Sequence, residues 1–312
     1  MIYLTGDTHG YIDIRKLLKN NVTTQMTEED YLIICGDFGL VWHYKHETGK
    51  ERKWLKWLNK QKWTTLFADG NHECFPRLNS YPVKEWHGGK VHEILPKVLH
   101  LMRGEIFELE GKSIFVMGGA SSHDRGPAVG DTEQVIGKFW WPEEIPSKEE
   151  FDHGLANLKQ HDYKVNYIVT HCLPTFLQEF VKQGKYAPDA ATEYLENIYH
   201  TVDYDHWYCG HYHYDLDADK KVTVLFTRIL EAGKNVRDSA MMLGVPKYRR
   251  DDTVLFHCNG EERFGTIKET MPWGTLTKHD EPYYNIVLFP EDENRTAVQV
   301  RESEIIEKSL IR

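Results

Sequence analysis

Five short segments of the sequence place Asp, His or Asn side chains just after apolar runs that are typical of buried strands. They are Asp7 and His9 in "YLTGDTHG", Asp37 in "IICGDFG", Asn71 and His72 in "FADGNHE", His171 in "IVTHCLP", and His211 and His213 in "WYCGHYH". In four of the five segments a Gly precedes the first of these residues. Because ligands of open α/β sheets bind at the carboxyl ends of the strands, these side chains could converge on the edge of one sheet.

The residue types indicate a metal centre with two ions. Carboxylate, amide and imidazole ligands without a thiolate suit Mn, Fe, Ni or Zn, and of these we expect Mn first. Seven candidate ligands are too many for one tetrahedral zinc but fit two adjacent divalent ions: Asp7, His9, Asp37, Asn71, His171, His211 and His213. Two neighbouring cations need a shared anion between them, and Asp37 is our candidate for that bridge.

The summed charges of the metal ions and their ligands indicate which chemistry this centre could perform. Two divalent ions set against the carboxylates of Asp7 and Asp37 leave about two positive charges, which would attract a phosphate ester even to a chain of net charge −10. Bound metals also lower the pKa of water, so hydroxide becomes available as a nucleophile near neutral pH. We therefore expect hydrolysis of a phosphate mono- or diester by a metal-bridging hydroxide.

The residue order D-x-H, G-D, G-N-H-E, H and G-H-x-H resembles the calcineurin-like metallophosphoesterase superfamily, over residues 5 to 213. The resemblance implies a four-layer α/β/β/α sandwich with a dinuclear centre. It assigns to one metal Asp7, His9, Asp37 and His213, and to the other Asp37, Asn71, His171 and His211. It also implies that His72 does not bind metal, but contacts the substrate and protonates the leaving oxygen.

Two positions depart from subfamilies of that superfamily. Protein serine/threonine phosphatases carry an Asp where this chain has Leu40, and an Arg where it has Asp69. The Asp that usually orients the His after the Asn is therefore missing, which disfavours that subfamily. Purple acid phosphatases have a Tyr ligand at the Leu40 position, so a tyrosinate-iron centre is disfavoured as well. Asp69 or Glu73 could orient His72 instead.

Further residues could contact the substrate. In "GGASSHDRGP" Arg125 could bind a phosphate oxygen bidentately, although a plain polar turn explains the segment equally well. Asn71 and His72 would also face the substrate. Trp140 and Trp141 could pack against a substrate base, with a role in the core or a hinge as the alternative. We expect surface or loop positions for five histidines outside these segments: His43, His46, His87, His92 and His100.

The composition of the chain limits the class of protein and the partners that can be expected. The chain has 312 residues, 40% apolar and 28% charged, as is usual for a soluble globular protein. Its acidic balance gives no support for binding nucleic acid by charge alone, although nucleic acid stays open as a substrate. Met1 leads directly into "IYLTGDTHG" with no signal peptide or membrane-length apolar run, so we expect a cytoplasmic protein without membrane contact. The five cysteines form no C-x-x-C pair and are expected to be buried free thiols.

Strand and helix patterns alternate along most of the chain, which predicts an α/β domain over residues 1–235. Strands are expected at 2–5, 31–35, 64–68, 113–117, 165–170, 206–209 and 222–230, and helices at 12–20, 51–61, 147–161 and 188–201. Residues 105–117 read as a hairpin, which makes the sheets mixed. The stretch from 75 to 104 is expected to be an irregular excursion.

The sequence pattern changes near the C-terminus, where short predicted strands alternate with turns that contain Gly, Pro and Asp. Residues 246–312 are therefore expected to form a small β-barrel, which weakly resembles SH3-like domains and could bind a protein partner. Two other functions remain open: a nuclease of the same superfamily, and a non-catalytic scaffold that keeps the fold. A scaffold would have lost metal ligands or the His after the Asn, and every one of these is present here.

Overall fold

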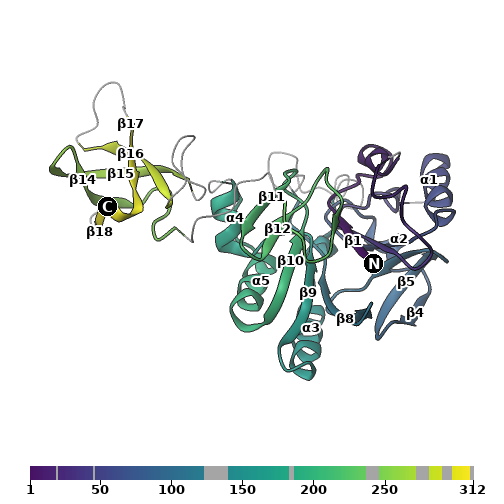
Figure 1. The fold of residues 1–312 in the computed structure, drawn as a ribbon. Helices are drawn as coiled ribbons and strands as arrows, with labels where there is room; N and C mark the ends of the chain where they lie inside the picture. Colours follow the sequence, from purple (N-terminus) through teal and green to yellow (C-terminus); the bar gives the residue numbers. More distant parts are fainter. Residues whose placement is uncertain are drawn as a thin grey trace. The chain divides into compact units, whose positions relative to one another are not determined.

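The computed structural model describes residues 1–18, 20–44, 46–122, 140–182, 186–236, 246–271, 281–289 and 297–309 (Figure 1). The chain divides into two compact units. The first comprises Met1–Pro174, Asp189–Leu216 and Lys221–Arg237, and the second comprises Thr175–Pro188, Asp217–Lys220 and Asp238–Arg312.

The first sheet is built around parallel strands near the N-terminus. Its strand order is β13-β1-β2-β3-β6-β5-β4, with β1 Ile2–Thr5, β2 Tyr31–Cys35, β3 Thr64–Ala68, β4 Val83–Trp86, β5 Gly89–Leu95, β6 Val98–Leu101 and β13 Leu230–Glu231. The predicted strands at 2–5, 31–35 and 64–68 are confirmed residue for residue. Strands β1, β2, β3 and β6 run parallel, and their near-continuous apolar sequences fit strands covered on both faces.

The second sheet faces the first through a shared core. Its order is β11-β12-β10-β9-β8-β7, with β7 Ile106–Leu109, β8 Lys112–Met117, β9 Lys164–Thr170, β10 Asp203–Cys209, β11 Leu216–Asp219 and β12 Val222–Val224. One buried cluster contains Ile33 and Leu66 from the first sheet together with Val116 and Val169 from the second, so the sheets pack face to face. The antiparallel pair β7–β8 confirms the predicted hairpin and makes the sheet mixed.

The described helices up to Thr201 are η1 Asp13–Leu17, α1 Gly49–Asn59, α2 Phe75–Leu78, η2 Pro142–Glu144, α3 Lys148–Gln160, α4 Thr175–Lys182 and α5 Ala190–Thr201. Among them, α1, α3 and α5 begin after a residue whose side chain caps the first turn. Ser147 accepts a hydrogen bond from the Glu150 backbone, which confirms the predicted capping box. Asp189 caps α5, so that helix starts after Pro188 rather than at it. The predicted helix at 12–20 is a short 3-10 helix.

Two sequence predictions for the first unit are wrong. Residues 75–104 are not irregular, because they contain α2 and strands β4, β5 and β6, which extend the first sheet. The turn between β4 and β5 uses His87 and Gly88 at positive φ, and the polar strand before it lacks an apolar pattern. The predicted strand at 222–230 is broken, because the Asp215 carboxylate accepts hydrogen bonds from the backbone of Phe226 and Thr227.

The second unit contains an antiparallel sheet of order β17-β16-β15-β14-β18. Its strands are β14 Thr253–Cys258, β15 Glu261–Met271, β16 Tyr283–Leu288, β17 Ala297–Arg301 and β18 Ile305–Lys308, and η3 Glu302–Glu304 precedes the last. Val254, Phe256, Ile267 and Ile286 are buried together at its core. A mixed α/β fold with an antiparallel C-terminal sheet is therefore confirmed. The complete four-layer sandwich, the barrel with its SH3-like character, and the domain boundaries stay predictions.

Candidate metal centre

The five candidate segments follow the carboxyl ends of strands from both sheets. Three of them follow β1, β2 and β3, which are neighbours in the first sheet, and two follow β9 and β10, which are neighbours in the second. The expectation of a single sheet edge is therefore wrong. The face-to-face packing brings the carboxyl ends of parallel strands from the two sheets together. Candidate ligands that are far apart in the sequence meet between these two sheet edges.

Asp37 lies at the middle of the cluster. Its Oδ1 is 3.2 Å from Nε2 of His171, and its Oδ2 is 3.4 Å from Nε2 of His9. On the other side of His9, Oδ2 of Asp7 lies 3.2 Å from Nε2 of His213. Possible ligand atoms lie within 4.8 Å of one another in three groups: Asp7, His9 and His213; His9, Asp37 and His72; and Asp7, Asp37 and His171.

The two remaining candidate ligands lie beside His171. Oδ1 of Asn71 is 3.3 Å from Nε2 of His171, and the His211 ring packs edge-on against the His171 ring with centroids 4.9 Å apart. All seven predicted ligands are thus in or next to the cluster. Their actual binding of metal stays a prediction.

Hydrogen bonds on the outer side of two histidines aim their inner nitrogens at the cluster. Nδ1 of His171 lies 2.9 Å from the carbonyl oxygen of Cys35, and can bond it only as a donor. Nδ1 of His9 lies 2.6 Å from Oδ2 of Asp13. Such contacts are characteristic of metal-binding histidines, because they fix the tautomer and leave Nε2 as the ligand atom.

The charges in the cluster favour a bound cation. Burial alone would lower the pKa of His171, but the nearby charge of Asp37 outweighs it and raises the pKa to about 10. Burial would lower the pKa of His9 too, and the hydrogen bond and charge of Asp37 raise it to about 9. Positive charge at these positions is therefore stabilised, whether a proton or a metal ion supplies it.

One buried oxygen gives a direct test of whether a metal would fit. Oδ1 of Asp7 accepts a hydrogen bond of 2.8 Å from the backbone of His211. Oδ2 of the same carboxylate is buried and accepts no hydrogen bond from any part of the chain that the structure describes. Nε2 of His213 lies 3.2 Å from this oxygen but does not meet hydrogen-bond geometry. A buried carboxylate oxygen without a hydrogen bond is costly, and coordination of a cation would remove that cost. The residues present therefore fit a divalent metal.

Left-handed backbone conformations accumulate at the candidate ligands. His9, Asp37, His211 and His213 have φ of 41°, 48°, 69° and 57°. Non-glycine residues rarely adopt such angles, and the strain persists where the surrounding structure imposes it, often at functional sites. The loops are thus held in shapes that local preference alone would not give.

Three of the four glycines that precede candidate ligands make room for candidate ligands from other strands. A Cβ at Gly36 would lie 2.1 Å from Nδ1 of His171, and one at Gly70 would lie 2.1 Å from Oδ1 of Asp37. The same atom at Gly210 would lie 2.2 Å from Oδ1 of Asp7. A side chain at any of these positions would displace a ligand, which explains the repeated Gly in the sequence pattern.

Two ionisable residues, the buried Glu73 and the half-buried Lys16, support the ligand loops. Glu73 is fully buried and accepts hydrogen bonds from the backbone of Phe38 and Gly39, directly after Asp37. Lys16, on η1, donates from Nζ to the carbonyl oxygens of Gly6 at 2.8 Å and Asp7 at 2.7 Å. The role of Lys16 could not be predicted from the sequence, because nothing in its amphipathic segment distinguishes it from a surface lysine.

His72 is oriented by aromatic contacts rather than by a carboxylate. Its ring lies 5.3 Å from the Trp42 ring and 5.5 Å from the His9 ring, between centroids. Its Nε2 is 4.0 Å from Oδ2 of Asp37. The suggestion that Asp69 or Glu73 orients it is wrong, because the hydrogen bonds of both carboxylates go to other groups.

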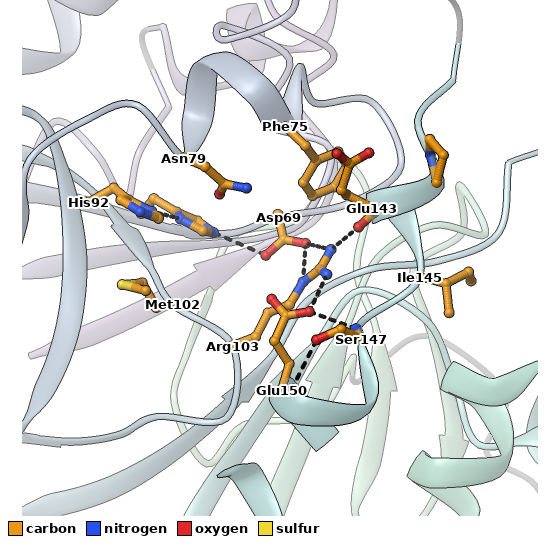
Figure 2. A pocket seen from close by; sticks show the side chains of 12 residues that line it. Asp69, Phe75, Asn79, His92, Met102, Arg103, Glu143, Ile145, Ser147 and Glu150 are labelled. Carbon is orange, nitrogen blue, oxygen red and sulfur yellow. Dashed lines mark hydrogen bonds and ion pairs between the residues drawn. The ribbon is translucent and has the colours of Figure 1, made fainter. Parts of the chain in front are cut away.

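Asp69 belongs to a separate buried network (Figure 2). Its carboxylate accepts hydrogen bonds from Nε of Arg103 at 2.8 Å and from Nε2 of His100 at 3.0 Å. The other nitrogen of His100 lies 3.0 Å from Nδ1 of His92. These residues line a pocket of about 590 Å³. His92 and His100 are buried, so their expected surface position is wrong, whereas His43, His46 and His87 are exposed as expected.

The remaining predicted substrate contacts have different outcomes. Arg125 lies outside the described residues, as do His123 and Asp124. The backbone of Ser122 donates to Oε2 of Glu144 at 3.2 Å. Trp140 and Trp141 are both buried, and Trp141 packs with Cys74 and Phe75, so the core alternative for this pair is confirmed.

Comparison with known families gives one match. The family profile described as calcineurin-like phosphoesterase matches residues 1–215, a span that contains all the candidate ligands and His72. No curated protein matches the chain. Every described helix is too short or too polar to cross a membrane.

Proposed function

Because the chain belongs to the calcineurin-like phosphoesterase family, we propose that it hydrolyses phosphate esters at this centre with two divalent ions bound. The position of Asp37 is the observation that carries the proposal. Its two carboxylate oxygens face different histidines, His171 at 3.2 Å and His9 at 3.4 Å. A carboxylate shared in this way suits a bridge between two cations.

The donor set supports two sites on either side of Asp37. Asp7, His9 and His213 would complete one site, and Asn71, His171 and His211 would complete the other. Oxygen and imidazole donors without thiolate suit Mn, and also Fe, Ni or Zn. When bound, the ions would supply positive charge to the phosphate oxygens and make hydroxide available near neutral pH.

Asn71 keeps the centre positive. Its amide oxygen faces His171 at 3.3 Å and brings no negative charge. With an Asp at this position, three carboxylates would surround the ions instead of two, and an anionic ester would be held less strongly. The charge balance therefore depends on the neutral ligand.

His72 has the position of a general acid. It borders the cluster, and its side chain keeps 36% of its surface exposed, so a substrate can reach it. The rings of Trp42 and His9 both contact its ring. We assign it the transfer of a proton to the leaving oxygen, a step that typically contributes about 10²–10⁴-fold to the rate.

The test begins with the bound metal. The purified protein is analysed for metal, then assayed with p-nitrophenyl phosphate, bis-p-nitrophenyl phosphate and single-stranded DNA and RNA. Hydrolysis of the small esters alone supports the general assignment, whereas degradation of nucleic acid identifies a nuclease. Stoichiometric metal without hydrolysis of any phosphoester in a broad panel would overturn the proposal in favour of a scaffold.

His72→Ala tests the assigned proton transfer. We expect this variant to keep its metal and lose about 10²–10⁴-fold in kcat. His46→Ala is the matched control, because His46 is an exposed histidine outside the cluster. Equal activity of the two variants would remove His72 from the mechanism.

A further inference from the structure

A second, smaller pocket opens beside the candidate metal ligands. It has a volume of about 260 Å³ and is lined by His9, Tyr11, Ile12, Gly39, Trp42, His43, Glu51 and His72. The pocket therefore contains a ligand, His9, and the proposed general acid, His72. Most of its remaining wall is apolar, from Tyr11, Ile12 and Trp42.

The described residues that line this pocket include no Lys or Arg. Glu51, the charged residue among them, is 2% exposed, and its Oε1 accepts hydrogen bonds from the Trp42 backbone at 2.9 Å and from Arg77 at 2.8 Å. Its charge is therefore already compensated within the protein. Lys50, which does not line the pocket, places its ammonium over the Tyr11 ring, 4.4 Å from the ring centre. The walls offer little to a second phosphate or another strongly anionic group.

The rim of the pocket exposes large apolar side chains. Tyr11 is 40% exposed and Ile12 is 62% exposed. Apolar surface of this kind, bordered by polar residues, is characteristic of ligand-binding grooves, because a bound apolar group removes it from water. Trp42 is held by the Trp141 ring, 5.4 Å away between centroids, so its ring is already positioned before a ligand arrives.

We propose that this pocket binds the leaving group of the ester, and that this group is an uncharged, planar aromatic or heteroaromatic of about one or two rings. The inference rests on the proposed function, because a proton from His72 to the leaving oxygen places that oxygen at the pocket wall. In this step the bond from phosphorus to the leaving oxygen breaks while a bond from phosphorus to a water oxygen forms. The leaving oxygen takes the proton of His72, and the proton lost by water returns to His72 or to solvent.

The size of the pocket sets the size of the group. Sites for drug-sized ligands span about 300–1,000 Å³. At about 260 Å³ this pocket is just below that range, which suits one or two rings. Flat faces of Tyr11 and Trp42 would favour a planar ring over a flexible alkyl or sugar group, since aromatic pairs gain beyond their buried area.

Non-hydrolysable phosphonates test the inference without differences in leaving-group reactivity. Ethylphosphonate, benzylphosphonate and 1-naphthylmethylphosphonate all carry a CH₂ in place of the ester oxygen. They are compared as inhibitors of bis-p-nitrophenyl phosphate hydrolysis by the metal-loaded protein. We expect both aryl compounds to inhibit at least tenfold more tightly than ethylphosphonate.

Exposed residues on the rim supply the variants. Tyr11→Ser and Ile12→Ser should each bring the ratio of ethyl to benzyl inhibition constants closer to one, since they remove part of the apolar wall. Tyr163→Ser is the matched control: Tyr163 is 39% exposed but follows α3 and precedes β9, at the opposite end of that strand from His171. The control should keep the ratio of the unmodified protein.

This design distinguishes failure of the leaving-group assignment from failure of the proposed function. Equal inhibition by the ethyl and aryl compounds, in a protein that hydrolyses the diester, would overturn the leaving-group assignment and leave the proposed function standing. A metal-loaded protein that hydrolyses no phosphoester in a broad panel would contradict the proposed function. Calorimetric binding of the same phosphonates would then decide the inference by itself, with preference for the aryl compounds expected and equal binding overturning it.

Discussion

Two buried carboxylates at strand ends of the first sheet have opposite surroundings. Asp69, after β3, accepts hydrogen bonds from Arg103 and His100. Asp7, after β1, is equally buried, but its Oδ2 accepts no hydrogen bond from the described residues. The negative charge of Asp69 is neutralised by the protein itself, whereas that of Asp7 lies among candidate ligands, where we propose that a metal ion binds.

The charges in the Asp69 network are compensated by residues of the network itself. Arg103 also donates to Oε2 of Glu150 at 3.2 Å and to the carbonyl oxygen of Glu143 at 2.9 Å, and it lies over the Phe75 ring. Burial would raise the pKa of Asp69, but Arg103 and His100 hold it well below its usual value. This carboxylate is therefore stabilised as an anion without a metal, although it stands only two positions before Asn71.

The largest effect is expected from removing the bridging charge. Asp37→Asn keeps the size of the side chain but removes the anion shared by both proposed metal sites. We expect metal content to fall and kcat/KM to drop by at least about 10³-fold, which corresponds to about 4 kcal/mol. Elemental analysis and the diester assay measure both. Full metal content with full activity would show that Asp37 is no bridge.

Arg103→Met disrupts the Asp69 network instead. It leaves the Asp69 anion buried without its main partner, and breaking such a pair costs about 3–5 kcal/mol of unfolding free energy. Urea denaturation measures the loss. Arg52→Met is the control, because the ion pair of Arg52 with Glu47 is on the surface and should contribute about 0–1 kcal/mol. A stable Arg103→Met variant that loses metal would show that the two carboxylate clusters are not independent.

Asp13→Asn tests the outer support of the metal cluster. It removes the charge that faces Nδ1 of His9 at 2.6 Å, without removing a proposed ligand. Loss of such a partner typically weakens metal affinity about 10–100-fold. Metal titration of the variant and the unmodified protein measures the change, and unchanged affinity would contradict this role for Asp13.

The smallest effect concerns acid stability at the far end of the Asp69 network. Burial lowers the pKa of His92 to about 4, and the neighbouring His100 adds to the shift. The unfolded chain, with a histidine pKa of about 6.5, then binds more protons between these values. Stability due to neutral His92 is thus present above pH 6.5 and is lost as the pH falls toward 4.

His92→Gln removes this titrating group. The decrease in unfolding free energy between pH 7 and pH 5 should be smaller in the variant by up to about 2 kcal/mol, because the interval from pH 6.5 to pH 5 spans about 1.5 pH units at about 1.4 kcal/mol each. Urea denaturation at both values measures it. Identical decreases in the two proteins would show that His92 does not contribute to the acid sensitivity.

Much of the fold could be predicted, because the strands near the site have apolar patterns that can be recognised locally in the sequence. Apolar runs at 2–5, 31–35 and 64–68 became β1, β2 and β3 without a shifted residue. The hairpin of β4 and β5 could not be predicted in this way, since its first strand is largely exposed and has no apolar pattern. The partners of Asp69 could not be predicted either, because Arg103 follows it by 34 positions on the far side of that hairpin.

The sequence by itself determined the identity and order of the candidate ligands, because each follows its own strand and the pattern is local. The tertiary structure decided which carboxylate is satisfied, which residue orients His72, and where an apolar pocket adjoins the cluster. These depend on contacts between distant segments, such as the bond of His171 to the carbonyl of Cys35, 136 positions away. Such contacts arise only when two sheets pack face to face, and no local pattern in the chain encodes them.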